Sequence, residues 1–240
     1  MRPTVPLAAG FVLALASSST ASAYVVAKDE NGNTEHWVVE SVTFRAPDSY
    51  PAPLATADAR SAITNAATSW TRASGLEVGV EGVSSGSPGY DPSSSDNHND
   101  IFFLSSDWSY GDSLIAVTVA TVDISTGQLL DTDIMFNAQD RQFSILPDGH
   151  PAGGLYDDVQ SVATHEMGHA LGLAHNPTLV TATMYGGAMR GEVNKRTLTA
   201  DDIAGVQSIY APLLAEERTP PAAGCATGVG APTLGALFLS

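Results

Sequence analysis

The chain has 240 residues, 43% of them hydrophobic, which excludes a wholly disordered chain and suffices for one domain with a buried core. Its formal net charge of −16 argues against nucleic acid or an anionic membrane surface as a partner. The single cysteine, Cys225, excludes an intramolecular disulfide and a CxxC-type metal or redox site.

The first 23 residues have the composition of an export signal. Arg2 is followed by an apolar run at residues 7–16, and Ala21-Ser22-Ala23 is a pattern that signal peptidases accept. The apolar run is too short to span a bilayer as a mature anchor. We therefore predict a signal peptide at residues 1–23 and a secreted or cell-surface protein, with a buried N-terminal helix as the alternative.

The first half of the remaining chain alternates strand and helix patterns. Apolar and polar residues alternate over 36–44, which predicts a strand. Apolar residues at helical spacing predict a helix over 56–74, with Thr56 as its N-cap. A second strand is expected at 76–83, followed by a polar loop at 84–100.

The second half adds strands and two helices. Strands are predicted at 101–104, 114–122 and 133–137. A helix is predicted from Asp157, which forms a capping box with Gln160. A final helix at 199–210 begins with Thr199 as its N-cap. These elements indicate a mixed sheet with helices packed on it.

We expect one globular domain over residues 24–212, and a Pro/Gly/Ala-rich linker with an apolar tail over 213–240. In the tail, Cys225 precedes an apolar stretch at 229–239 that is too short to span a bilayer by the usual length rule. The tail weakly resembles the sorting tails of some bacterial surface proteins, and a frayed end explains it equally well. Membrane association is expected only through this tail, and the protein is expected to be a monomer.

Residues 165–175 (HEMGHALGLAH) contain the candidate metal-binding and catalytic residues. His165 and His169 are four residues apart and share one helical face, so both imidazoles can reach one cation. Glu166 lies beside them and can take a proton from a metal-activated water. Gly172 can adopt the left-handed conformation that ends a helix, which lets His175 approach as a third ligand. Three histidine ligands leave one zinc position open, as in catalytic sites.

The extended motif HExxHxxGxxH is the signature of the metzincin metallopeptidases, and this sequence resembles their matrixin branch over most of residues 36–210. The resemblance implies an α+β, zincin/metzincin-like fold: a twisted mixed five-stranded sheet, a long active-site helix and a C-terminal helix. It also implies a methionine turn under the metal, at Met184. By the same resemblance, an extended substrate would lie along the edge strand within residues 114–122.

Several features depart from animal matrixins. Val117 and Met135 stand where we align the histidines of their second, structural zinc site, so we expect no such site. No cysteine precedes Cys225, so a propeptide cysteine switch is absent from this sequence. Gly186 and Gly187 follow the methionine turn where a proline-led wall usually shapes the substrate pocket, so the family's pocket preference cannot be transferred.

The sequence therefore predicts an exported zinc-dependent endopeptidase that acts on protein or peptide substrates, with His165, His169 and His175 as ligands and Glu166 as general base. A non-catalytic, zinc-dependent surface binding or adhesion module is the alternative. Calcium is a second cofactor candidate, because residues 91–100 are rich in oxygen ligands, although a solvated acidic loop explains them as well.

Overall fold

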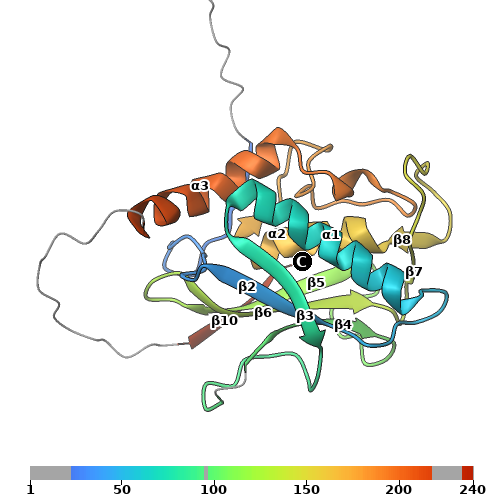
Figure 1. Ribbon diagram of the computed structural model, residues 1–240, viewed down its shortest axis with the longest axis horizontal. Helices are drawn as coiled ribbons and strands as arrows, with labels where there is room; N and C mark the ends of the chain where they lie inside the picture. The colour runs from blue at the N-terminus through green and yellow to red at the C-terminus, as the bar shows by residue number, and fades with distance from the viewer. Residues whose placement is uncertain (1–22, 95–96, 218–233, 240) are drawn as a thin grey trace, which may run out of the picture.

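The computed structural model describes residues 23–94, 97–217 and 234–239 (Figure 1). All but the last residue of the predicted signal peptide lies outside these ranges, as do Cys225 and most of the predicted linker.

The elements alternate between strands and helices along the chain. In order, they are β1 (Val25–Val26), β2 (Ser41–Ala46), α1 (Thr56–Ser74), β3 (Glu77–Val83), β4 (Asn99–Leu104), β5 (Ala116–Asp123), β6 (Gln128–Asn137), β7 (Gln142–Ser144), β8 (Tyr156–Asp158), α2 (Val159–Ala170), β9 (Leu173–Ala174), the 3-10 turn η1 (Asn194–Arg196), α3 (Ala200–Glu217) and β10 (Leu234–Leu239).

The central sheet has the order β10-β5-β6-β4-β2-β3. Strands β3, β2, β4 and β6 run parallel, whereas β5 is antiparallel to β6. The predicted mixed five-stranded sheet is thus confirmed in β5-β6-β4-β2-β3. Strand β10, from the predicted tail, adds antiparallel to β5 and pairs with Thr118–Asp123.

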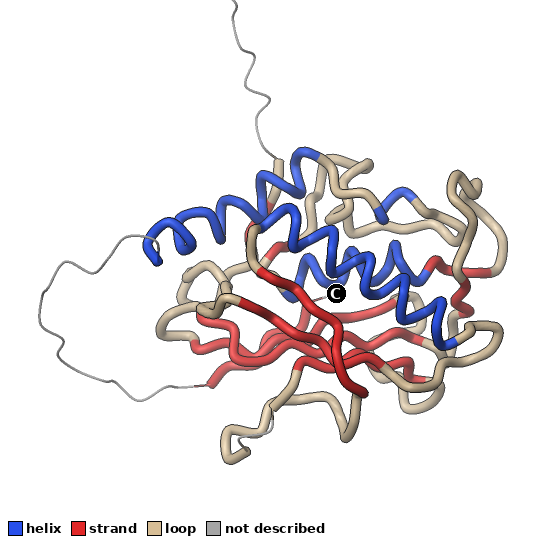
Figure 2. Tube along the Cα trace, viewed as in Figure 1, coloured by secondary structure: helices blue, strands red, loops and turns tan. Residues whose placement is uncertain are grey.

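The helices α1, α2 and α3 lie together on one side of the sheet, and the long loop between β3 and β4 projects on the other side (Figures 1 and 2). Two small sheets, β1-β9 and β7-β8, flank α2. No helix within the described ranges has the length and apolar character that crossing a membrane requires.

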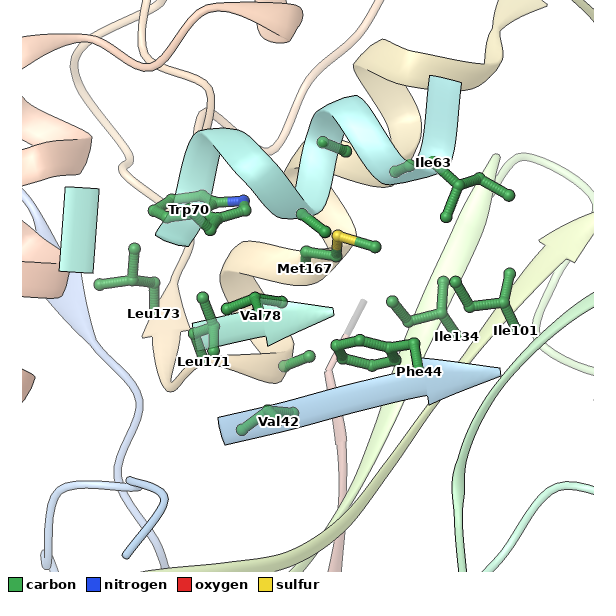
Figure 3. Packing of buried hydrophobic residues seen from close by; sticks show 14 of the residues in the cluster. Val42, Phe44, Ile63, Trp70, Val78, Ile101, Ile134, Met167, Leu171 and Leu173 are labelled. Atoms are coloured by element: carbon green, nitrogen blue, oxygen red, sulfur yellow. The ribbon is translucent and has the colours of Figure 1, made fainter. Parts of the chain in front are cut away.

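The hydrophobic core fills the space between the helices and the sheet (Figure 3). Phe44, Ile101 and Ile134 contribute from the sheet, Trp70 from α1 and Met167 from α2, and all five are buried. The α1 residues that face α2 are mostly alanines, so the two helices approach closely, and Trp70 Nε1 donates to the Thr164 carbonyl at 2.8 Å. The core therefore fixes the middle of α2 from both sides.

Several predicted boundaries were wrong. The first long strand begins at Ser41, whereas His36 pairs with Gln128 at the start of β6 and Trp37 bonds the end of α2. Thr56 is the first residue of α1 and not its cap, since Ala55 occupies the cap position. The strand predicted at 133–137 begins at Gln128, and the last helix continues beyond residue 210.

Candidate metal centre and substrate pocket

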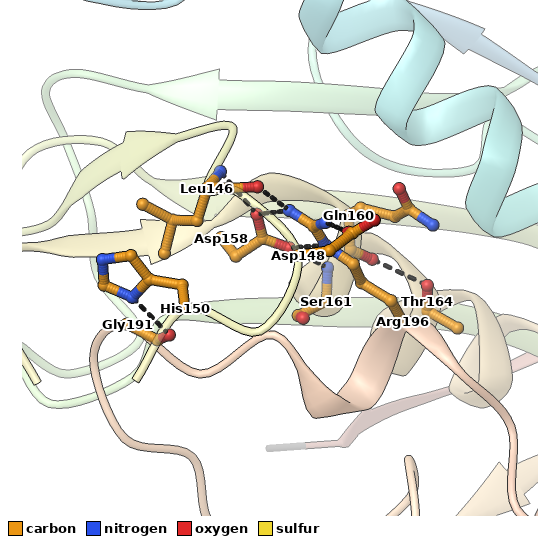
Figure 4. A network of polar contacts seen from close by, with 9 residues as sticks. All are labelled: Leu146, Asp148, His150, Asp158, Gln160, Ser161, Thr164, Gly191 and Arg196. Atoms are coloured by element: carbon orange, nitrogen blue, oxygen red, sulfur yellow. Dashed lines mark hydrogen bonds and ion pairs between the residues drawn. The ribbon is translucent and has the colours of Figure 1, made fainter. Parts of the chain in front are cut away.

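The N-terminus of α2 is held by Asp158, whose carboxylate accepts from Ser161 N at 2.9 Å. The prediction of Asp157 as the cap was wrong by one residue, because Asp157 pairs with Arg141 at 2.8 Å. Arg196 of η1 donates two hydrogen bonds to the Asp158 carboxylate, at 2.5 and 2.8 Å (Figure 4). This bidentate pair ties η1 to the start of α2.

The three predicted histidine ligands converge. His165 and His169 lie on α2, and His175 follows β9. Their candidate ligand atoms all lie within 4.8 Å of one another, and the Nε2 atoms of His165 and His175 are 3.1 Å apart. Within the part of the chain that the structure describes, this is the only group of three or more histidine, cysteine or carboxylate side chains close enough to hold one metal ion.

A left-handed turn at Gly172 brings His175 back toward α2. Gly172 has φ +88°, and a Cβ there would lie directly against the Glu35 carbonyl. Trp37 Nε1 and the Tyr210 hydroxyl donate to the carbonyls of Ala170 and Leu171, at 2.8 and 3.0 Å. The helix end is therefore stabilised by residues far away in sequence.

Met184 is buried, and its sulfur packs directly against Gly168 of α2. The turn that carries it is held by Asp202, which accepts from Thr183 N at 2.9 Å and from Met184 N at 3.0 Å. Asp202 also accepts from Thr199 Oγ1 at 2.7 Å, so the predicted cap of α3 and the methionine turn share one carboxylate.

The imidazole rings are oriented and kept neutral. His165 Nδ1 hydrogen-bonds the Thr183 carbonyl at 2.7 Å, and His169 Nδ1 hydrogen-bonds the Leu173 carbonyl at 2.8 Å. These bonds place the proton on Nδ1 and leave Nε2 free for a cation. Burial lowers the pKa of His165 well below its usual value and that of His169 to about 3, and it also lowers the pKa of His175.

Glu166 is buried beside this cluster, and among the described residues it forms no ion pair within 4.0 Å. Its Oε2 accepts a hydrogen bond from Thr118 Oγ1 of β5 at 2.8 Å. Burial raises the pKa of Glu166 to about 7, and the Thr118 hydrogen bond and the charge of Lys195 counteract part of that rise. A carboxyl group with a pKa near neutrality can both take and return a proton.

A cavity of about 270 Å³ opens next to Glu166. Its walls come from the start of β5, from α2, from the segment after the methionine turn and from η1. They comprise Ser113, Leu114, Ile115, Ala116, Val162, His165, Glu166, His175, Gly186, Gly187, Ala188 and Lys195. Substitutions at Gly186 would fill the space next to the His175 ring.

The donor set fits zinc. Three neutral imidazoles, two of which have Nδ1 bonded to a backbone carbonyl, suit a tetrahedral site with one position left for water or substrate. In the segment considered for calcium, Asp91 accepts from Ser93 N at 2.8 Å and Asp100 pairs with Arg45 at 2.6 Å.

Thr118, Lys195 and Asp202 contact the site residues and were not singled out as site residues from the sequence. Thr118 lies in an apolar strand without any motif around it. Lys195 carried one usable signal, since the acidic chain has only one other lysine, Lys28. Sequence spacing could not show that Lys195 faces the cavity.

Comparison with known proteins gives a consistent result. The matrixin family model matches residues 94–211. Metalloendoproteinase 1-MMP of Arabidopsis thaliana is 49% identical over 55 residues, which cover 23% of this chain and 15% of that protein. Human matrix metalloproteinase-16 is 40% identical over 67 residues, which cover 27% and 10% respectively. Rat matrilysin is 45% identical over 49 residues, which cover 20% and 18%. The matched segments thus span less than a fifth of these relatives.

Proposed function

We propose that this chain is an exported, matrixin-like zinc-dependent endopeptidase with Glu166 as its general base, which the match of residues 94–211 to the matrixin family model supports. The single observation that carries the proposal is the convergence of His165, His169 and His175 next to a buried carboxyl group at a cavity. A surface binding module would have no use for a base in that place.

His165, His169 and His175 would hold the metal through Nε2. When bound, zinc would polarise the scissile carbonyl and lower the pKa of the attacking water. Glu166 would accept a proton from the attacking water and pass it to the leaving amine. Thr118 holds the Glu166 carboxyl group on the β5 side of the cavity through the hydrogen bond to Oε2. Met184 supports α2 from below, at Gly168.

A peptide substrate would bind as an extended strand beside the start of β5. Strand addition supplies backbone hydrogen bonds, while alternate side chains enter pockets. Strand β10 pairs with Thr118–Asp123, whereas the cavity is lined by residues 113–116. Residues 113–116, at and just before the start of β5, would therefore serve the substrate, and a longer substrate would compete with β10, whose pairing begins at Thr118.

Export is proposed from composition. Residues 1–23 combine one basic residue, an apolar run and a small-residue cleavage pattern. A protein secreted or held at the cell surface would meet protein and peptide substrates there.

The test is hydrolysis of casein by the full mature chain, with zinc content measured by elemental analysis. We expect a chelator to abolish turnover and added zinc to restore it. Glu166→Ala should keep zinc and lose at least about 100-fold in kcat, the usual contribution of a general base. The matched control is the exposed Glu30→Ala, which should behave as wild type.

His175→Ala completes the test, because it should lower zinc occupancy as well as turnover. Turnover retained by Glu166→Ala would exclude Glu166 as the base. A zinc-loaded wild-type protein that cleaves no protein or peptide would instead support the binding-module alternative.

A further inference from the structure

We propose that Lys195 makes this site selective for substrates with an acidic side chain next to the scissile bond. The inference rests on the proposed function and names the substrate class of the same site. It depends on one buried ammonium group at the wall of the catalytic cavity.

The position of Lys195 is fixed by its surroundings. It lies on η1, is 5% exposed and lines the cavity that contains Glu166, His165 and His175. Its neighbour Arg196 is anchored to Asp158 at the start of α2 and to the Leu146 carbonyl at 2.6 Å (Figure 4). The backbone that carries Lys195 is therefore tied to the helix that carries the catalytic groups.

Two of the three ammonium protons have protein acceptors. Nζ donates to the Thr183 carbonyl at 3.0 Å and to the Tyr185 carbonyl, both on the methionine turn. The Tyr185 ring centroid lies 5.9 Å from Nζ. Among the described residues, Nζ has no further hydrogen-bond acceptor, so one proton remains for a ligand.

The charge of Lys195 is not neutralised locally. No carboxylate of the described chain lies within 4.0 Å of Nζ. Glu192, Asp202 and Glu166 interact with it only at longer range, and Asp202 is already engaged by Thr183 N and Met184 N. A buried charge without a partner costs free energy, and a substrate carboxylate in the cavity would supply that partner.

The rest of the cavity can accommodate an acidic side chain. Gly186, Gly187 and Ala188 line it without long side chains, which leaves room beside Lys195. Leu114, Ile115 and Val162 provide apolar contact for the methylene groups of such a residue. Glu166 lines the same cavity, where its carboxyl group is held by Thr118 and serves the scissile bond.

The experiment compares peptides that differ only in one residue flanking the scissile bond, on either side: Glu, its uncharged isostere Gln, or Leu. The zinc-loaded full chain should cleave the Glu peptide with a kcat/KM roughly 10- to 100-fold above the Gln peptide, the size expected of a charge-assisted hydrogen bond in a desolvated site. Lys195→Met should remove or invert this preference and favour Leu. Lys28→Met alters the other, exposed lysine and should retain the wild-type ratio.

The ratio of kcat/KM for the Glu peptide to that for the Gln peptide distinguishes a role of Lys195 in selectivity from a purely structural role. A uniform drop of Lys195→Met on all peptides with an unchanged Glu-to-Gln ratio would assign Lys195 a structural role and overturn the proposal. A wild-type enzyme that cleaves Gln or Leu peptides as well as Glu peptides would also overturn it.

A binding measurement keeps the inference testable if Lys195→Met does not fold or if no peptide is cleaved. In the zinc-loaded Glu166→Ala protein, calorimetry should find the Glu peptide bound at least about 10-fold more tightly than the Gln peptide. Equal affinities would overturn the inference. Tighter Glu binding without any cleavage by wild type would refute the proposed function and leave the acidic preference standing.

Discussion

Glu35 is expected to make the protein less stable as the pH rises. Its side chain is fully buried, and neither carboxyl oxygen has a hydrogen-bond partner among the described residues. Burial, and secondarily the charge of Asp29, raise the pKa of Glu35 from 4.5 to about 7. The folded state therefore holds this proton more tightly than the unfolded state does.

The direction of this pH effect follows from the difference in proton binding between the folded and unfolded states. Below pH 4.5, Glu35 is protonated in both states and has no effect on the pH dependence. Between pH 4.5 and about 7, unfolding releases a proton, so the free energy of unfolding falls as pH rises. A shift of this size corresponds to about 3 kcal/mol in total, of which roughly 2 to 3 kcal/mol is lost between pH 5 and pH 8.

Glu35→Gln removes the titration and nearly conserves shape. We expect the stability of Glu35→Gln relative to wild type to increase by roughly 2 to 3 kcal/mol from pH 5 to pH 8. Urea unfolding followed by tryptophan fluorescence measures this change. The comparison between the two proteins cancels the pH dependence of metal binding and of Asp131 and Asp133, whose pKa values burial also raises.

Glu30→Gln, at an exposed position, is the matched control and should show no such change. A stability difference between Glu35→Gln and wild type that stays constant across this pH range would refute the reasoning.

Two further predictions concern the turn and the edge strand. Gly172→Ala forces a side chain into a left-handed conformation and against the Glu35 carbonyl, so it should cost about 1 to 3 kcal/mol and lower zinc occupancy, as measured by thermal unfolding and elemental analysis; unchanged occupancy would mean that His175 reaches the site without this turn. Ending the chain after Glu217 removes β10, and it should raise kcat/KM for long substrates more than for short peptides, because an intramolecular strand competes at a high effective concentration; equal effects on both lengths would show that β10 and substrate do not compete.

The local parts of the site were predictable from the sequence. The four-residue spacing of His165 and His169 places both on one face of a helix, and the glycine at position 172 ends that helix. Both effects depend only on residues close together in sequence. The structure brings His175 to the same point for that reason. The matrixin resemblance extended this local pattern to the mixed sheet and to Met184.

Contacts between distant segments were not predictable. Asp157 and Asp158 are adjacent carboxylates with equal capping potential. Their roles are decided by Arg141, which precedes β7, and by Arg196 of η1. The start of β6 at Gln128 depends on its pairing with β5 across the turn at Gly127. Neither arginine nor that pairing leaves a periodic signal in the sequence.

The charges of this protein act at two ranges. The net charge of −16 repels an acidic substrate at a distance, yet salt screens that repulsion beyond about 8 to 10 Å. The ammonium group of Lys195 lies in a buried cavity, where screening is weak and one carboxylate can be paired directly. A preference for acidic substrates would therefore arise from direct contact with Lys195 beside Glu166, and not from long-range attraction between the protein and the substrate. The surface can then stay strongly acidic without reversing the selectivity of the site.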